Sequence, residues 1–279
     1  LSKEVESQDK SHSCRTRLLF LLLFWILSLA SADELEGIAV QNYGTSQKTE
    51  LLPQVVKVGL FIPDLSEFKA LNVDYCSYFG EKPPVRVCVQ IPGNEIIAYF
   101  VIFNQENGVQ LANIKENLHI QCVNTIVCPN VGPYSQMNKL QNILFMAGNI
   151  GLHPPNMCLI HPEDVVLQYK QVKCNYNAVL RKSLNSHHVI WQQVTKSALI
   201  FIAAHTDISL LMPHLKRNFG FIAAHTVVLR VAKLPMNCLV EVELLGDSAG
   251  PQDAQAPLPF SVRQKLYAAE DLKQFHGET

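Results

Sequence analysis

The sequence predicts an α+β fold made of two related units, of which the second is the longer. Two observations predict it. Runs of β-branched and aromatic residues alternate with segments in which apolar residues recur at helical spacing. The strand–helix–strand order of residues 55–90 also returns, with more elements in front of it, within residues 142–245. A chain of 279 residues allows about two domains, and its 48% hydrophobic content is enough for packed cores.

The first unit is predicted to begin with a strand at residues 55–62, which are rich in strand-forming residues. Asp64 follows and is expected to cap a helix, with Glu67 closing a capping box three residues later. Pro83-Pro84 ends this helix, and residues 85–90 form the next strand. This unit is therefore strand, helix, strand.

The second unit is predicted to contain more elements. In chain order they are a strand at 142–146, a helix at 163–182, a strand at 197–202, a helical stretch at 207–219, and strands at 226–231 and 238–245. Pro213 is expected to disturb the second helical stretch. The hexapeptide FIAAHT occurs at both 201–206 and 221–226, which we interpret as a local duplication without a function. The apolar face of the first helix comprises Val165, Tyr169, Val172, Tyr176, Val179 and Leu180.

The two ends of the chain are predicted to lie outside these units. Residues 18–32, LLFLLLFWILSLASA, follow two arginines and are typical of a secretory signal, being shorter than a membrane-spanning helix. The alternative is a fragment or a gene-prediction artefact, since the chain begins with Leu. We predict an unstructured leader at 1–50, a partial unit at 51–110, a second unit at 120–246, and a linker and tail at 247–279 with a short amphipathic helix near 262–275.

Composition disfavours several classes of function. A formal net charge of -1 gives no electrostatic reason to expect nucleic acid. None of the eight cysteines forms a Cys-x-x-Cys pair, which disfavours a zinc knuckle and favours reduced thiols in a cytoplasmic protein. Secretion, or contact with a membrane, requires that residues 18–32 be a genuine signal peptide. His205 and His225 have no carboxylate or Cys at ligand spacing, so we expect no metal site.

Three side chains are candidates for a binding or catalytic site. Arg86 lies at the start of a strand, where a guanidinium can hold a carboxylate with two hydrogen bonds or can simply face solvent. Tyr134 belongs to a Gly-Pro-Tyr-Ser turn before an apolar hairpin, and it either supports that turn or lines a pocket. Glu241 shares one strand face with Glu243, where a carboxylate can orient water as a general base or can be solvated.

These residues resemble the reactive-intermediate deaminase family, also called YjgF/RidA-like. The resemblance implies two chorismate-mutase-like modules, each a mixed sheet backed by two helices, the first module being incomplete. It also implies a homo-oligomer or pseudo-trimer with pockets between subunits. The segments that carry it are residues 58–64 and 84–86 in the first unit, and 132–136, 147–151, 228–235 and 239–243 in the second.

The same resemblance implies an activity, because family members hydrolyse reactive enamines and imines to ketoacids. The resemblance implies that Arg86 binds the substrate carboxylate, Tyr134 lines the pocket and Glu241 activates water. The position that matches Arg86 in the second unit is His225, and an imidazole cannot make the bidentate contact. Neither unit then holds a complete set, so a working site requires Arg86 of one unit to face Tyr134 and Glu241 of the other.

Two such units in tandem also resemble the carboxyl-terminal half of long-form diphthine–ammonia ligases, which amidate diphthine on elongation factor 2 with ATP and ammonium in diphthamide biosynthesis. The resemblance implies elongation factor 2 as a partner and ATP for the full-length enzyme. No cofactor is expected in this chain, which lacks the Ser-Gly-Gly-Lys-Asp-Ser loop of the nucleotide domain. Three hypotheses follow: a non-catalytic assembly region of the ligase, an imine deaminase, and a secreted binding protein.

Overall fold

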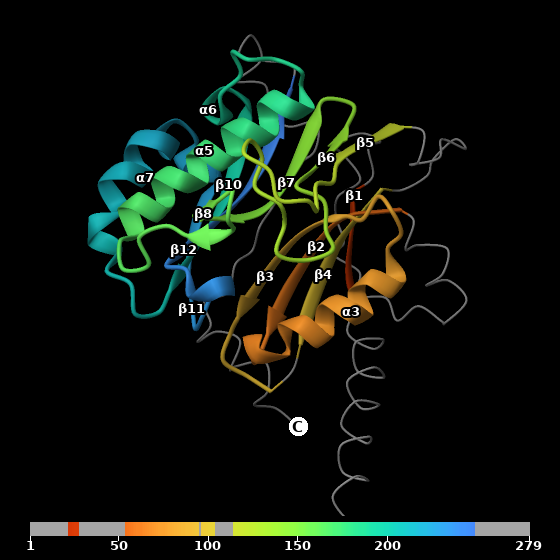
Figure 1. Ribbon diagram of the computed structural model, residues 1–279, viewed down its shortest axis with the longest axis horizontal. Coiled ribbons are helices and arrows are strands. Elements are labelled where there is room, and N and C mark those ends of the chain that lie inside the picture. Colours follow the sequence, from red (N-terminus) through yellow and green to blue (C-terminus); the bar gives the residue numbers. More distant parts are fainter. Residues whose placement is uncertain (1–21, 28–53, 95, 104–113, 249–279) are drawn as a thin grey trace, which may run out of the picture.

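The computed structural model describes residues 22–27, 54–94, 96–103 and 114–248. Their strands form a four-stranded sheet of order β1-β4-β2-β3, a six-stranded sheet of order β11-β10-β12-β7-β6-β5, and the small pair β8-β9 (Figure 1). The observed fold is thus a mixed α+β fold. The predicted helix near residues 262–275 and most of the predicted leader lie outside the described residues.

The four-stranded sheet contains the predicted first unit. The strands β2 (Val55–Ile62) and β3 (Val85–Gln90) run parallel, are joined by helix α3 (Phe68–Tyr78), and have the predicted bounds. The predicted capping box is wrong. The Asp64 carboxylate accepts hydrogen bonds from the Ser66 amide and hydroxyl, and it caps the short 3-10 turn η2 (Leu65–Glu67) ahead of α3. This local turn takes the acceptor that a capping box with Glu67 would need.

Two strands of this sheet differ from the prediction. Strand β1 (Leu22–Leu27) lies inside the predicted leader and pairs in parallel with β4 (Ile97–Phe103). A run of Leu, Phe, Trp and Ile suits a strand as well as a signal, because both need apolar bulk. Strand β4 has no counterpart among the predicted strands, and it runs antiparallel to β2.

The six-stranded sheet and its helices form the second unit. All the predicted strands and helices are present, with their ends shifted by a few residues, and the six predicted core residues of α5 (Val165–Ser183) are buried. Pro213 lies in the first turn of α7 (Met212–Phe219), where its missing N–H is not needed, so it begins the helix and does not disturb it. Among the described residues, the structure contains no helix with the length and apolar character of a membrane span.

The strands are β5 (Lys115–Leu118), β6 (Met137–Leu140), β7 (Ile143–Ile150), β8 (Leu152–His153), β9 (Cys158–Leu159), β10 (Thr195–Ala203), β11 (Thr226–Val231) and β12 (Val240–Asp247), and the helices are α5 (Val165–Ser183), α6 (Trp191–Val194), α7 (Met212–Phe219) and the 3-10 turns η4 (Ile208–Leu210), η5 (Gly220–His225) and η6 (Pro235–Asn237).

Both sheets contain the same three-strand arrangement. In the first, β2 lies between the parallel strand β3 and the antiparallel strand β4; in the second, β10 lies between the parallel strand β11 and the antiparallel strand β12. A helix links the parallel pair in each case, α3 in the first and α7 in the second. The larger sheet continues through β7, β6 and β5, and it carries α5, α6 and α7 (Figure 1).

Three hydrophobic clusters hold these layers together. One lies between the larger sheet and its helices, and a second lies between the smaller sheet, α3 and the β6–β7 hairpin. The third joins the two sheets to each other. In it the Phe61 and Phe201 rings lie edge to face, with their centres 6.3 Å apart. Strand β3 lies against β7, so the side chains of one sheet are buried against those of the other. Residues of the third cluster include Val87, Val89, Ile150, Leu199 and Val231.

Candidate functional site

Arg86 projects from β3 into the protein and is only 1% exposed. Its Nη2 atom donates to Asn72 Oδ1 on α3 at 2.6 Å. Its guanidinium carbon lies 4.5 Å from the ring centre of Tyr75 and 4.8 Å from that of Tyr134. The alternative of a solvent-facing arginine is therefore wrong. A buried guanidinium between aromatic rings is attracted to their faces but keeps most of its hydrogen-bonding capacity.

Tyr134 reaches Arg86 because the turn before β6 is tied to the start of β3. The Ser135 amide donates to the Pro84 carbonyl at 3.2 Å, and the Ser135 hydroxyl donates to the Pro83 carbonyl at 2.6 Å. Tyr134 is buried, and it belongs to the cluster that contains α3. The predicted hairpin is confirmed, since β6 and β7 pair antiparallel, and the interpretation that Tyr134 lines a pocket stays a prediction.

Glu241 enters the same region from β12 of the larger sheet. It is 4% exposed, so the alternative of a solvated face is wrong for this carboxylate. Burial raises its pKa to about 8, and the positive charge of Arg86 opposes that rise. The approach of the carboxylate depends on Gly148, because a Cβ at that position would lie 2.0 Å from Glu241 Oε1. Arg86, Tyr134 and Glu241 are thus within electrostatic reach of one another.

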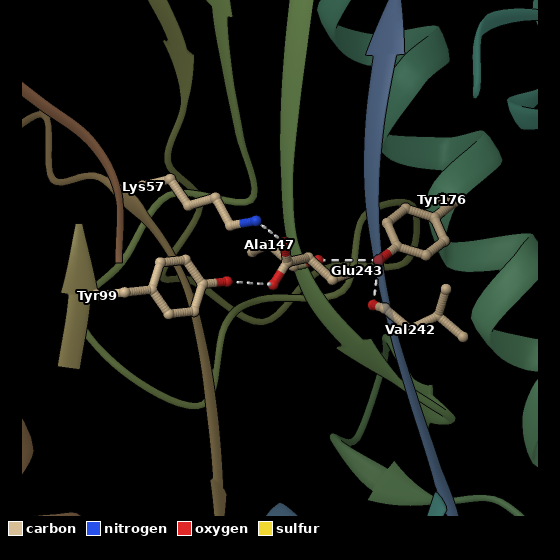
Figure 2. A network of polar contacts seen from close by, with 6 residues as sticks. All are labelled: Lys57, Tyr99, Ala147, Tyr176, Val242 and Glu243. Atoms are coloured by element: carbon tan, nitrogen blue, oxygen red, sulfur yellow. Dashed lines mark hydrogen bonds and ion pairs between the residues drawn. The ribbon is translucent and has the colours of Figure 1, made fainter. Parts of the chain in front are cut away.

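A β-bulge beside Glu241 shapes this part of the sheet. The pairing of β12 with β7 shifts register between Val242 and Leu244. The Tyr176 hydroxyl from α5 lies against the carbonyl oxygens of Ala147 and Val242 at this register shift, and its single proton can be donated to either of them (Figure 2). Bulges commonly redirect side chains next to functional sites.

Glu243 makes a second polar contact between the sheets. Its carboxylate forms an ion pair with Lys57 of β2 and accepts a hydrogen bond from the Tyr99 hydroxyl of β4 at 3.4 Å (Figure 2). Burial lowers the pKa of the Lys57 ammonium to about 7. Glu243 is therefore engaged in joining the sheets, whereas Glu241 Oε2 has no hydrogen-bond partner among the described residues.

Several buried polar atoms around Arg86 have no hydrogen-bond partner among the described residues. They are Arg86 Nε and Nη1, Glu241 Oε2 and the Tyr75 hydroxyl. Buried polar groups are nearly always satisfied, so such a group of orphans in one region marks a place where a ligand or water would complete the hydrogen bonds. Two donors on Arg86 and one oxygen on Glu241 suit a small molecule that has both a carboxylate and a second polar centre.

The assignment of His225 to the position matching Arg86 is wrong by one residue. In the smaller sheet, Val58 on the central strand pairs with Arg86 on the parallel strand and with Phe100 on the antiparallel strand. In the larger sheet, Ala198 on the central strand pairs in the same way with Thr226 and Leu244. Each of these antiparallel pairs follows a register shift at the start of its central strand, so Thr226 occupies the position of Arg86. His225 is exposed at the end of η5, and the described contacts of the Arg86 cluster do not include it.

The same comparison explains why the first sheet lacks a glutamate. Phe61 and Phe201 occupy equivalent positions on the two central strands. Phe61 pairs with Ile97 and Phe201 pairs with Glu241, so Ile97 takes the position of Glu241. Tyr99 likewise takes the position of Glu243. At these matching positions the smaller sheet carries the arginine and the larger sheet carries the glutamate.

Sequence reasoning missed Asn72 and Cys88 near the site. Cys88 lies two residues after Arg86 on the same face of β3, and alternation along the strand could have identified it. Burial raises the pKa of its thiol to about 12, which keeps it protonated and weakly nucleophilic. Asn72 gives no comparable signal, because a polar residue on a helix is ordinary. Within the described residues no group of three or more His, Cys, Asp or Glu side chains gathers as metal ligands would.

Comparison with known proteins identifies relatives of this region. Residues 125–246 match the Endoribonuclease L-PSP family. A RutC family protein of Synechocystis sp. is 32% identical over 114 residues, which span 40% of this chain and 84% of that protein. The diphthine–ammonia ligase of Schizosaccharomyces pombe is 32% identical over 118 residues, which span 42% of this chain but only 18% of the ligase.

Among solved structures, the Rid family protein YyfA of Yersinia pestis is 25% identical, with a TM-score of 0.40 over 48% of this chain and 98% of that one. The identity to the Synechocystis protein extends over most of that relative's length. This chain carries an Endoribonuclease L-PSP (YjgF/RidA) domain and belongs to the RutC family.

Proposed function

We propose that the chain binds a small 2-imino or 2-enamino carboxylic acid between its two sheets and hydrolyses it to a ketoacid and ammonia. The observation that supports this most is that Arg86 from β3 and Glu241 from β12 are both buried, interact electrostatically, and carry polar atoms without hydrogen-bond partners among the described residues. The two groups come from different sheets and supply what each sheet lacks alone. This arrangement favours the deaminase hypothesis over a non-catalytic region.

Arg86 is the carboxylate-binding group in this proposal. Its Nε and Nη1 donors, which have no hydrogen-bond partner in the described part of the chain, are buried, and a charge-assisted bond to a carboxylate is stronger there than at the surface. The Tyr75 and Tyr134 rings flank the guanidinium and limit its movement. A substrate carboxylate bound there is held in one orientation relative to Glu241.

Glu241 is the proton carrier. With a pKa of about 8 its carboxyl is mostly protonated at neutral pH, so it can donate its proton to the imine nitrogen. The resulting carboxylate takes a proton from water as the water oxygen bonds to the C=N carbon, which gives a neutral carbinolamine. Glu241 then protonates the amino group and accepts the hydroxyl proton as the C–N bond breaks. Ammonia and the ketoacid leave, and Glu241 is again protonated.

The test is hydrolysis of the unstable product that threonine dehydratase forms from threonine, followed by trapping the ketoacid that is released. The protein should accelerate ketoacid formation, and both Glu241→Gln and Arg86→Met should remove the acceleration. Glu116→Gln, at an exposed carboxylate on β5, is the matched control and should keep it. No acceleration by the wild-type protein, or full activity in Glu241→Gln, would refute the proposal.

We propose as a second candidate that this chain corresponds to the tandem YjgF/RidA region of a diphthine–ammonia ligase. The shared strand order of its two sheets and the 32% identity to the S. pombe ligase support it. Elongation factor 2 would then be a partner, with ATP bound by another part of the full-length enzyme. Two sheets in one chain would also supply two of the three units of a pseudo-trimer.

Exchange of the matched 118-residue region of the S. pombe ligase for residues 125–246 of this chain tests that candidate. Diphthamide on elongation factor 2, measured by mass spectrometry, should be retained in cells that carry the chimera. The same ligase with the region deleted is the control. Accumulation of diphthine in cells with a soluble chimera would argue against this relationship.

A further inference from the structure

Asn72 is placed to control how the Arg86 guanidinium is presented. It lies on α3, outside the segments that carry the family resemblance, and its Oδ1 accepts from Arg86 Nη2 at 2.6 Å. This is the hydrogen bond that the structure gives the guanidinium within the described part of the chain. Arg86 Nε and Nη1 have no hydrogen-bond partner among these described residues.

The geometry of a guanidinium gives that contact a consequence. Each of its two bidentate forks uses one N–H of Nη2, together with an N–H of either Nη1 or Nε. An acceptor on Nη2 therefore occupies one fork and leaves the other open. Gly132 lies beside this hydrogen bond, because a Cβ there would be 2.5 Å from Nη2 and 2.9 Å from Asn72 Oδ1.

The charge of the acceptor matters as much as its position. An amide oxygen orients the guanidinium without neutralising it, whereas a carboxylate at the same place would form an ion pair and compete with any anionic ligand. The rings of Tyr75, Tyr134 and Phe68 surround the guanidinium with their centres 4.5 to 5.3 Å from its carbon, and they are also uncharged. The surroundings thus hold Arg86 while leaving its positive charge available.

We propose that Asn72 is a positioning residue of the site: it directs one fork of Arg86 toward the ligand carboxylate and, being neutral, preserves the charge that attracts it. The inference deepens the proposed function, since it rests on a carboxylate ligand at Arg86. It adds a determinant from α3 that neither the strands nor the hairpin supplies.

Binding of 2-oxobutanoate, a stable ketoacid, tests this by calorimetry on the full chain. Asn72→Leu should weaken binding about tenfold, since an oriented charge-assisted contact is lost. Asn72→Asp should weaken it about a hundredfold or more while raising the melting temperature above that of Asn72→Leu, because the new carboxylate pairs with Arg86. A purely structural role would move affinity and melting temperature together.

The matched control is Val73→Asp, which adds the same charge to the same helix at a side chain that is 68% exposed. It should leave 2-oxobutanoate binding unchanged. If the wild-type protein binds 2-oxobutanoate and Asn72→Asp binds it equally well, the role of Asn72 is overturned and the carboxylate site is not. Absence of wild-type binding would overturn the carboxylate site and the role of Asn72 together. Turnover is not measured, so failure of the hydrolysis proposal is distinguishable from both.

Discussion

Replacing Glu241 with Gln should make the protein more stable at alkaline pH. Glu241 has a pKa of about 8 in the folded protein against an ordinary value of 4.5. A carboxyl whose pKa is higher when folded contributes its full stability below the unfolded pKa, and this contribution is lost as the pH rises through the folded pKa. Between about pH 5.5 and about pH 8.5 this linkage lowers the free energy of unfolding by about 3 kcal/mol. Glutamine keeps the shape and cannot ionise.

Urea unfolding followed by the fluorescence of the buried Trp191 measures this effect at both pH values. The stability of Glu241→Gln relative to wild type should rise by about 3 kcal/mol from the lower to the higher pH. Glu116→Gln, at an exposed side chain, should show the same small difference from wild type at both. A difference between Glu241→Gln and wild type that does not change with pH would refute the burial of an ionisable Glu241.

Three further outcomes are expected. Lys57→Met should lower the free energy of unfolding by about 3 to 5 kcal/mol, because it leaves Glu243 buried without its ion-pair partner. In urea unfolding, the double variant Lys57→Met/Glu243→Gln should recover most of that loss. A loss below about 1 kcal/mol would mean that the ion pair is solvated. Gly148→Ala should lower stability by about 1 to 3 kcal/mol and abolish 2-oxobutanoate binding, since its Cβ would displace the Glu241 carboxylate; retained affinity in calorimetry would contradict this. Pro213→Ala should change the melting temperature by only a few degrees because the proline begins α7, and a loss of helical circular dichroism would speak against that position.

Much of the fold could be predicted from local patterns. Strands such as β2 and β11 are rich in β-branched residues, and the apolar residues of α5 recur at helical spacing, so they lie on one face of the helix. The identical FIAAHT segments show the limit of local sequence. Residues 201–206 begin inside a strand, whereas residues 221–226 begin in the 3-10 turn η5, because the neighbouring elements differ.

The site was partly predictable. Arg86, Tyr134 and Glu241 were identified from residue type and resemblance, but their meeting depends on how the two sheets pack, which no local pattern encodes. Ser135 illustrates this, since its bonds to Pro83 and Pro84 span 50 residues or so of sequence and bring Tyr134 to Arg86. The one-residue error at His225 arose because only strand register, and not sequence spacing, shows that Thr226 faces the equivalent neighbour.

A crystal structure of the protein with 2-oxobutanoate would test the composite site most directly. We predict the ligand carboxylate within about 3 Å of the Arg86 guanidinium nitrogens, with the keto carbon facing Glu241 Oε2. The ligand would then touch β3 of one sheet and β12 of the other. Density for the ligand at a place that contacts neither Arg86 nor Glu241 would contradict the account.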